Sequence, residues 1–322
     1  MVNNTTGSRN VAVGLQALYT NTAGNSNTAV GNLSLNKNST GERNTSLGEV
    51  SLTNNINGNF NTALGFSSLH DNSGGDQNTA VGFAAMNFNY SGNYNTALGS
   101  NSLYSNTSGD HNTALGFSSG SAIVSGNNLT LIGYNSQPSS ASANNQITLG
   151  NSSVTSLRCN VQTITSLSDM RDKKNIKDLT FGLDFLMKVK PRLFNWDKRE
   201  WYENNTSDGS KIKETPTAGF IAQELDEVQT TENAEWLNLV LKDNPEKIEA
   251  SYGNLLPVMV KAIQELKTEN DFLKKNNENL LSEIESLKSM NDKIVKLEKI
   301  VSKMSSDKSN EVKIISIRGD LR

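Results

Sequence analysis

A hydroxyl, two carboxylates and several cations lie close together in segment 168–176, which reads SDMRDKKNI. A serine hydroxyl becomes a nucleophile only when a base takes its proton. A lysine can be that base only if its amine is neutral near pH 7, so its pKa must fall well below the reference value of ~10.4. Burial lowers a lysine pKa, as do the like charges of Arg171 and Lys174, whereas Asp169 and Asp172 oppose the shift unless they pair elsewhere. The segment therefore allows serine-based chemistry, and the simpler interpretation is a helix or turn cap before a charged loop.

This segment separates two parts of different composition. Only three basic and five acidic residues precede Arg158, of 30 and 33 in the 322-residue chain, and the net charge of −3 gives no general attraction to nucleic acid or membrane. Cys159 is the single cysteine, which excludes an intramolecular disulfide and a cysteine-rich zinc site. No signal peptide is expected from the N-terminal residues, and no apolar run approaches the ~18 residues of a membrane helix. We expect no cofactor and no metal.

Residues 1–150 consist of a 17-residue repeat. Glycine recurs at Gly14, Gly31, Gly48, Gly65, Gly82, Gly99, Gly116, Gly133 and Gly150. Asparagine stands four residues before most of these glycines, from Asn10 to Asn112, and an apolar residue stands four residues after, from Leu18 to Leu103. A second glycine column runs from Gly24 to Gly126. A fixed period without helices is typical of a β-solenoid or β-roll with one repeat per coil.

Each coil is expected to contain two short strands separated by glycine turns. On such a strand, Thr62 and Leu64 share one face and Ala63 lies on the other. We expect each coil to bury about three large apolar side chains, a core too thin to support an isolated chain. Three chains are therefore predicted to pack together, with coils ~4.8 Å apart.

The repeat unit Asn-Thr-Ala-Leu/Val-Gly, as at 61–65, resembles the head repeats of trimeric autotransporter adhesins and the shafts of phage and giant-virus fibres. The resemblance implies either a passive spacer or a receptor-binding surface, and the expected receptor is a glycan on a host cell. Aromatic residues that could bind a sugar are Phe66, Phe83, Phe88, Tyr90, Tyr94 and Phe117. The five acidic residues form no obvious carboxylate pair for glycoside hydrolysis.

After the repeat, the pattern changes. Residues 151–167 break the period, and their apolar residues predict short junction strands; these residues are Val154, Leu157, Val161, Ile164 and Leu167. Residues 168–260 predict an α+β domain. Its elements are a helix at 181–189, a strand at 193–196, a polar loop at 201–217 and a strand entering a helix at 219–225.

A long helix is predicted from Tyr252, with Pro257 in its first turn. Over 261–308, apolar residues recur every seven positions, at Leu266, Leu273, Leu280, Leu287, Ile294 and Val301. Asn270 and Asn277 lie in the companion column, where polar residues fix register and chain number at some cost in stability. We expect a trimeric coiled coil followed by a tail at 309–322.

Segment 168–176 resembles the cleavage motif of the C-terminal intramolecular chaperones of phage endosialidases and tailspikes, a family shared with myelin regulatory factor. The motif residues present are Ser168, Asp169, Arg171, Lys173, Asn175 and Ile176. Further matches follow at 186–196, 219–225 and 252–266, so the resemblance covers residues 165–270.

The resemblance implies single-turnover autoproteolysis by a serine–lysine dyad. Ser168 is the implied nucleophile, Lys173 the implied general base, and the bond between Leu167 and Ser168 the one that is cut. Asp169, Arg171 and Asn175 are candidate supporting residues. Gln223 or Glu224 could orient the dyad, although the polar start of a helix explains both equally well.

The spacing of the implied dyad restricts its geometry. Five residues of extended chain span ~16 Å, beyond the reach of a lysine, and positions five apart on a helix diverge by about 140°. The chain must therefore turn sharply, or Lys173 must serve Ser168 of a neighbouring chain. We expect trimer assembly to bury Lys173 and so to control the cut.

Together these patterns predict a homotrimeric viral fibre or spike for host attachment, built from a mainly β solenoid, an α+β chaperone and a coiled coil. It would be made in the host cytoplasm and reside in the virion, with the chaperone fragment released after the cut. The alternatives are a trimeric adhesin or structural fibre that is not cut, and a polysaccharide-binding or polysaccharide-degrading tailspike. A membrane-tethered transcription factor is disfavoured, because neither a transmembrane helix nor a basic DNA-binding domain is found.

Overall fold

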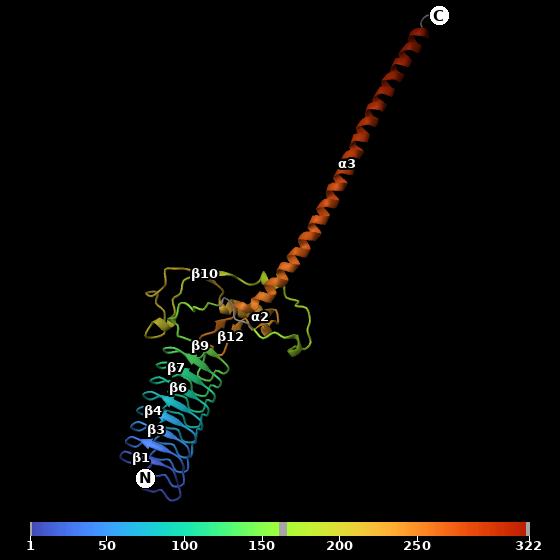
Figure 1. Cartoon of the computed structure of the whole chain (residues 1–322). Helices are drawn as coiled ribbons and strands as arrows, with labels where there is room; N and C mark the ends of the chain where they lie inside the picture. The colour runs from blue at the N-terminus through green and yellow to red at the C-terminus, as the bar shows by residue number, and fades with distance from the viewer. Residues whose placement is uncertain (1, 161–165, 320–322) are drawn as a thin grey trace. The chain divides into compact units, whose positions relative to one another are not determined.

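The computed structural model describes residues 2–160 and 166–319 (Figure 1). Its contacts divide the chain into two compact units. One comprises Met1–Asp172 with Leu241–Glu249, and the other comprises Lys173–Val240 with Ala250–Arg322. The first unit contains the 17-residue repeat, and the second contains mixed α and β structure and a long helix.

The repeat forms one parallel sheet with a strand from each coil. The strands are β1 (Val11–Val13), β2 (Thr28–Val30), β3 (Thr45–Leu47), β4 (Thr62–Leu64), β5 (Thr79–Val81), β6 (Thr96–Leu98), β7 (Thr113–Leu115), β8 (Thr130–Ile132) and β9 (Ile147–Leu149). Neighbours pair at an offset of one repeat, as with Thr62 opposite Thr79. The predicted β-solenoid is confirmed, but each coil has one three-residue strand rather than two. The backbone outside the strand explains the absence of a second one. The φ angles of Ser67, Leu69 and Gln77 are positive, at 56°, 48° and 56°, and these angles turn the rest of the coil away from strand geometry.

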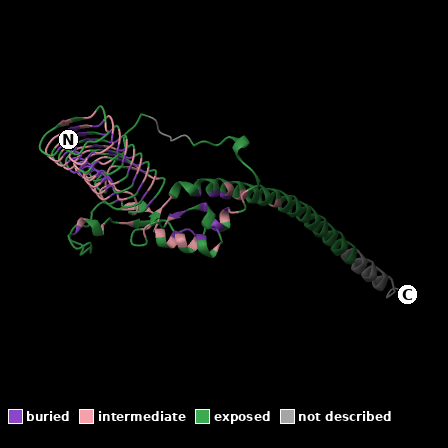
Figure 2. Cartoon of the chain, turned by 90° about the horizontal axis from the view of Figure 1, so that it is seen from below, coloured by how far each residue is buried: buried purple, intermediate pink, exposed green. Residues whose placement is uncertain are grey.

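The interior of the solenoid is narrow (Figure 2). Ala63 of β4 is buried, whereas Thr62 and Leu64 point outward and are exposed. Each of the first six coils buries one large side chain four residues after its glycine, namely Leu18, Leu35, Leu52, Leu69, Met86 and Leu103. The expectation of about three buried large side chains per coil is therefore wrong for these six coils, because the bulky face of each strand points out of the coil. The coil at 116–132 does bury three, namely Ile123, Leu129 and Leu131.

Two columns of buried asparagines fill much of the remaining interior. In the first, Asn55 Nδ2 donates to Asn38 Oδ1 at 2.7 Å and to the carbonyl oxygen of Gly58 at 3.0 Å. In the second, Asn61 Nδ2 donates to the carbonyl oxygen of Gly75 at 2.8 Å. A buried amide with such partners costs little, whereas one left without them costs about 1–3 kcal/mol. The asparagines therefore link successive coils where a larger protein would have an apolar core.

The glycine that follows each strand allows neighbouring coils to approach closely. A Cβ on Gly65 would lie 2.5 Å from the carbonyl oxygen of Gly82, and the φ of Gly65 is +133°. We expect Gly65→Ala to destabilise the solenoid by at least about 2 kcal/mol, because both the clash and the backbone conformation oppose it. Thermal melting of the full chain measures this effect. Gly74→Ala is the matched control, since its Cβ would meet only Asn57 Oδ1 at 3.1 Å; equal melting temperatures for the two variants would contradict the prediction.

The second unit has short elements. These are α1 (Leu183–Leu186), β10 (Arg192–Phe194), β11 (Thr217–Gly219) and α2 (Ala222–Thr231), with 3₁₀ turns η2 (Arg199–Trp201), η3 (Glu235–Leu237) and η4 (Tyr252–Leu255). Strands β10 and β11 pair antiparallel. Strand β12 (Val240–Leu241) pairs with β13 (Glu249–Ala250), and these two strands lie at the ends of segment 241–249, which belongs to the first unit. The buried side chains include Phe185, Leu225, Leu237, Leu239, Leu255, Val258 and Ala262. The predicted helix at 181–189 and the strand at 193–196 are present with shorter bounds as α1 and β10. The predicted strand entering a helix at 219–225 is present as β11 and α2, which together extend beyond it to 217–231.

Helix α3 (Leu256–Gly319) leaves the α+β core as a single long helix. It begins one residue before Pro257, whose missing N–H needs no partner in a first turn. Helix α3 continues to Gly319 and so runs through most of the tail predicted at 309–322. No helix in the described part of the chain is long and apolar enough to cross a membrane.

The predicted junction strands at 151–167 are absent from the described part of that range, 151–160 and 166–167. Val154 and Leu157 are exposed there and have no partner strand to bury them. Val161 and Ile164 lie outside the described residues.

Candidate functional site

Segment 168–176 bends near its centre. Residues Met170–Asp172 form the 3₁₀ turn η1. The backbone N–H of Arg171 donates to Asp169 Oδ1 at 2.8 Å. Its side chain binds both oxygens of the same carboxylate, with Nε 3.0 Å from Oδ1 and Nη2 2.6 Å from Oδ2. The chain is therefore turned, rather than extended, in the interval that separates the two residues of the implied dyad.

Asp169 and Arg171 form an ion pair on the surface. The hydrogen bonds from Arg171 lower the pKa of the Asp169 carboxyl, and the same pairing raises the pKa of the Arg171 guanidinium. Asp169 is consequently ionised at neutral pH, and its carboxylate forms an ion pair with Arg171. This pairing meets one requirement for a lysine base, since an unpaired carboxylate beside the lysine would favour the charged ammonium form.

Leu167, Ser168 and Lys173 are all exposed. Exposure leaves the bond between Leu167 and Ser168 accessible, but it does not give Lys173 the burial that a neutral amine requires. The boundary between the two compact units falls between Asp172 and Lys173, so Ser168 and Lys173 belong to different units. Asn175 is also exposed and has a left-handed backbone, with φ 52°.

Glu224 and Gln223 lie in the first turn of α2. Glu224 pairs with Arg192 of β10, with Nε 2.8 Å from Oε2 and a second contact between Nη2 and Oε1. The hydrogen bond from Arg192 lowers the pKa of Glu224. Glu224 therefore fixes the start of α2 to β10, and Gln223 is exposed beside it.

Other polar contacts organise the second unit and were not singled out from the sequence. Glu265 Oε2 of α3 accepts the backbone N–H of Leu183 at 2.7 Å, and a Cβ on Gly182 would lie 2.2 Å from the same oxygen. Gln229 is buried, and its Oε1 accepts the N–H of Leu239 at 3.1 Å. Glu265 and Leu183 are 82 positions apart, so no local pattern could have revealed this contact.

Comparison with known proteins supplies the deciding observation. Residues 168–233 match the chaperone of endosialidase family, Peptidase_S74. No curated protein and no solved structure matches the chain. The family match begins at Ser168, the first residue of the motif recognised above, and it covers about a fifth of the chain.

The chaperone resemblance seen in the sequence is thereby confirmed, and Peptidase_S74 is an autocleaving family. This chain joins such a chaperone to an N-terminal β-solenoid and a long C-terminal helix, an arrangement consistent with tail-fibre and adhesin repeats. In the described part of the chain, no three His, Cys, Asp or Glu side chains gather as a metal site.

Proposed function

We propose that this protein is a homotrimeric viral fibre or spike whose C-terminal chaperone is removed by a cut between Leu167 and Ser168. The observation that carries the proposal is the start of the family match at Ser168, where the motif places the nucleophile. The mature part, 1–167, would be the shaft and receptor-binding part of the virion. The part from Ser168 onward would promote assembly in the host cytoplasm and then be released.

The exposed seam of α3 supports the trimer. Its heptad residues are exposed in the single chain, namely Leu266, Leu273, Leu280, Leu287, Ile294 and Val301. A helix with an apolar residue at every seventh position buries that seam against other helices. Other copies of the same helix are the partners that match this repeat in both length and register.

The proposed reaction breaks one peptide bond through an ester intermediate and consumes one water molecule. Ser168 Oγ attacks the carbonyl carbon of Leu167 while Lys173 Nζ takes the hydroxyl proton. The bond from that carbon to the Ser168 nitrogen breaks, and the nitrogen gains a proton to become a free amine. Water then hydrolyses the ester and leaves Leu167 with a carboxylate. The chain that is cut is itself the substrate, so each chain reacts once.

Assembly is proposed to control this reaction, since Lys173 is exposed in the single chain and burial is what a lysine base requires. The test is a chain that stops after Thr268. It keeps Glu265, Val258 and Ala262, which the α+β core uses, and it loses the heptads from Leu273 onward. We expect this variant to remain monomeric and uncut, while the full chain yields a trimer whose second fragment begins at Ser168. Native mass measurement and N-terminal sequencing distinguish the two.

Efficient cutting of a monomeric truncated chain would show that assembly does not control the reaction. An intact, monomeric full chain would refute the proposed function as a whole.

A further inference from the structure

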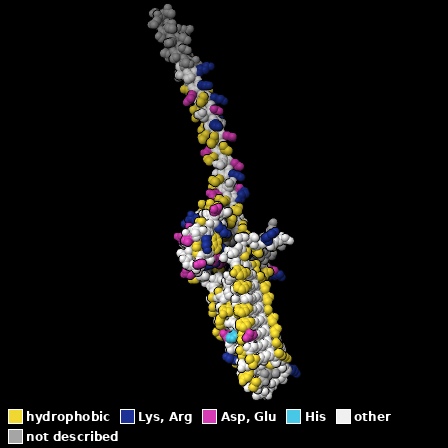
Figure 3. All heavy atoms as spheres, turned by 90° about the vertical axis from the view of Figure 1, so that its left-hand side faces the viewer, with side chains coloured by type: hydrophobic (Ala, Val, Ile, Leu, Met, Phe, Trp, Pro, Cys, Tyr) yellow, Lys and Arg dark blue, Asp and Glu magenta, His cyan; other side chains and the backbone are white. Residues whose placement is uncertain are grey.

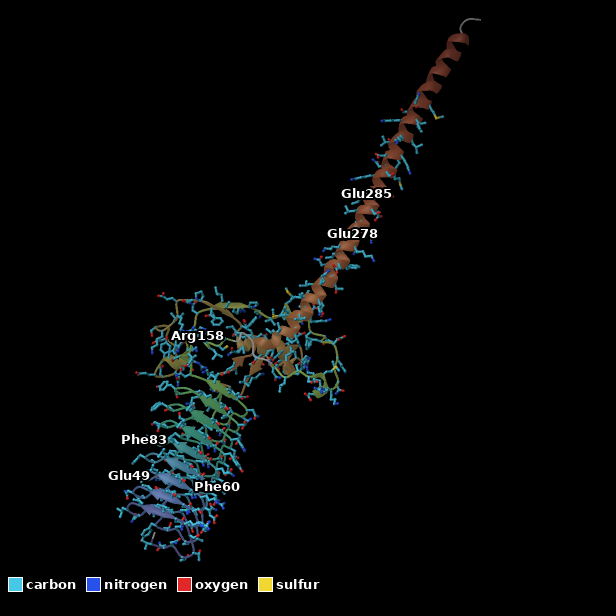
Figure 4. All side chains as sticks on the ribbon, in the orientation of Figure 1. Glu49, Phe60, Phe83, Arg158, Glu278 and Glu285 are labelled. Atoms are coloured by element: carbon cyan, nitrogen blue, oxygen red, sulfur yellow. The ribbon has the colours of Figure 1, made fainter. Side chains whose placement is uncertain are left out.

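One column of the solenoid surface changes its chemistry from coil to coil. It consists of the residue directly after each of the first eight repeat glycines, namely Leu15, Asn32, Glu49, Phe66, Phe83, Ser100, Phe117 and Tyr134. Figure 4 shows Glu49 and Phe83 on one edge of the solenoid and Phe60 on the other. In Figure 3, hydrophobic side chains gather in lengthwise bands on the solenoid. Within this column, two successive coils place phenylalanine side by side.

Phe66 and Phe83 form a flat apolar surface, here called the phenylalanine plate. Their ring centroids are 5.5 Å apart and the rings are nearly parallel, with an interplanar angle of 9°. They remain 48% and 54% exposed. The stacking therefore holds the rings in a fixed orientation without burying them, which is how a ligand-binding aromatic surface is prepared.

A polar hollow adjoins the plate. Its other lining includes Ser67, Asn87, Asn101, Tyr104 and Ser118, from four successive coils. Asn87 is buried, and its Nδ2 donates to the carbonyl oxygen of Ser67 at 3.0 Å and to Ser67 Oγ at 2.8 Å, which fixes the amide. Tyr104 is held edge-to-face against Phe88, with centroids 5.0 Å apart. No charged residue lines the hollow.

We propose that the phenylalanine plate and the polar hollow bind a neutral oligosaccharide. The C–H face of a pyranose ring is apolar and flat enough to lie on an aromatic ring, and its hydroxyl groups need amide and hydroxyl partners around that ring. Both kinds of surface meet here, and apolar walls with a few fixed polar groups are typical of ligand sites. The absence of charge in the lining favours a neutral sugar over a sialylated or sulfated one. This inference rests on the proposed attachment function and names the class of receptor.

Contact with another copy of the chain is a poorer explanation of the plate. Glu49 occupies the same column one coil below Phe66, so a contact between copies through this column would bring like charges together. The outward face of β1–β9 carries no charged residue and is the better surface for self-association.

The test uses the full chain after cutting, titrated calorimetrically with tetrasaccharides of glucose and of N-acetylglucosamine, and with sialyllactose as an anionic comparison. We expect at least one neutral sugar to bind, and the double variant Phe66→Ala/Phe83→Ala to bind it at least about tenfold more weakly. Phe60→Ala is the matched control, because Phe60 is an equally exposed phenylalanine of the solenoid that lies outside this column and outside the lining of the hollow. Its affinity should stay within about twofold of the original.

Each outcome bears on one proposal. A cut trimer that binds neither neutral sugar, binds sialyllactose instead, or binds equally well without the plate would overturn the sugar site and leave the fibre function intact. Plate-dependent binding by a chain that neither cuts nor trimerises would support the site and overturn the fibre function.

Discussion

Ser168→Ala is expected to leave the chain in one piece under conditions in which the original chain is cut completely. Removing the hydroxyl removes the only atom proposed to attack the Leu167 carbonyl, and loss of a catalytic nucleophile reduces rates by about 10³-fold or more. Lys173→Ala should have a similar effect, because the hydroxyl then has no base. Denaturing gels and intact mass measured over several days would follow the disappearance of the 35.0 kDa chain.

Neighbouring residues provide controls of the same type. Ser166 and Lys174 are exposed like Ser168 and Lys173 and lie within two residues of them. Ser166→Ala should be cut at nearly the original rate, and Lys174→Ala should be cut much faster than Lys173→Ala, because it loses a neighbouring charge and not the proposed base. If Ser168→Ala were cut at Leu167 as fast as Ser166→Ala, the serine mechanism would be wrong. If Lys174→Ala rather than Lys173→Ala stopped the reaction, the base would be misassigned.

The fold of the repeat was largely predictable because one period constrains every coil. Glycine at each seventeenth position, together with the Thr-Ala-Leu segment at 62–64, predicted a stacked β structure, and the pairing of Thr62 with Thr79 has that offset. The internal arrangement of a coil was not predictable. Period-two alternation shows that Leu64 and Ala63 lie on opposite faces, but it does not say which face is inside.

The asparagine columns explain why the usual rule for which side chains are buried did not hold in the coils. Large apolar residues normally face inward, but here Asn38 and Asn55 take the interior positions and Leu64 faces out. Asparagines in a repeat suggest turns, and only the stacking of identical coils lets one amide satisfy the next. That property belongs to the assembled solenoid rather than to any single repeat.

The candidate site likewise has one part that was predictable from the sequence and one part that was not. The motif from Ser168 to Ile176 is local and was found from sequence, and the family match begins at the same serine. The contacts that position the surrounding elements are not local. Arg192 with Glu224, and Leu183 with Glu265, join residues 32 and 82 positions apart, and nothing in either neighbourhood signals the partner.

The outward side chains of β1–β9, here called the sheet face, lead to the second large prediction. They are mainly threonine at the first position of each strand and leucine, valine or isoleucine at the third, with no charged residue in any strand. Leu47, Leu64, Leu98 and Leu115 are exposed there. A contiguous apolar band of this length is unusual on a monomer and typical of an interface. Because its chemistry is the same in every coil, it suits contact with identical copies aligned coil to coil.

We expect Leu64→Asp/Leu98→Asp to prevent the solenoids of three chains from packing together. Three-fold symmetry would place three carboxylates close together at each of two levels, and like charges facing each other at an interface cost several kcal/mol. Each coil should still form, because Leu64 and Leu98 point away from its interior. Analytical ultracentrifugation of the cut N-terminal fragment, with the cutting rate of the same sample, measures the effect.

Ile56→Asp is the matched control, since Ile56 is also an exposed apolar residue of the solenoid but lies outside the sheet face. It should leave the cut fragment trimeric. A monomeric fragment from the double variant, cut at the normal rate, would mean that α3 assembles the chaperone without help from the solenoid. If the double variant lost both cutting and trimer formation, the solenoid would take part in forming the cleavage site. A trimer that tolerates both aspartates would exclude the sheet face as the interface and leave its apolar band without a partner among copies of this chain.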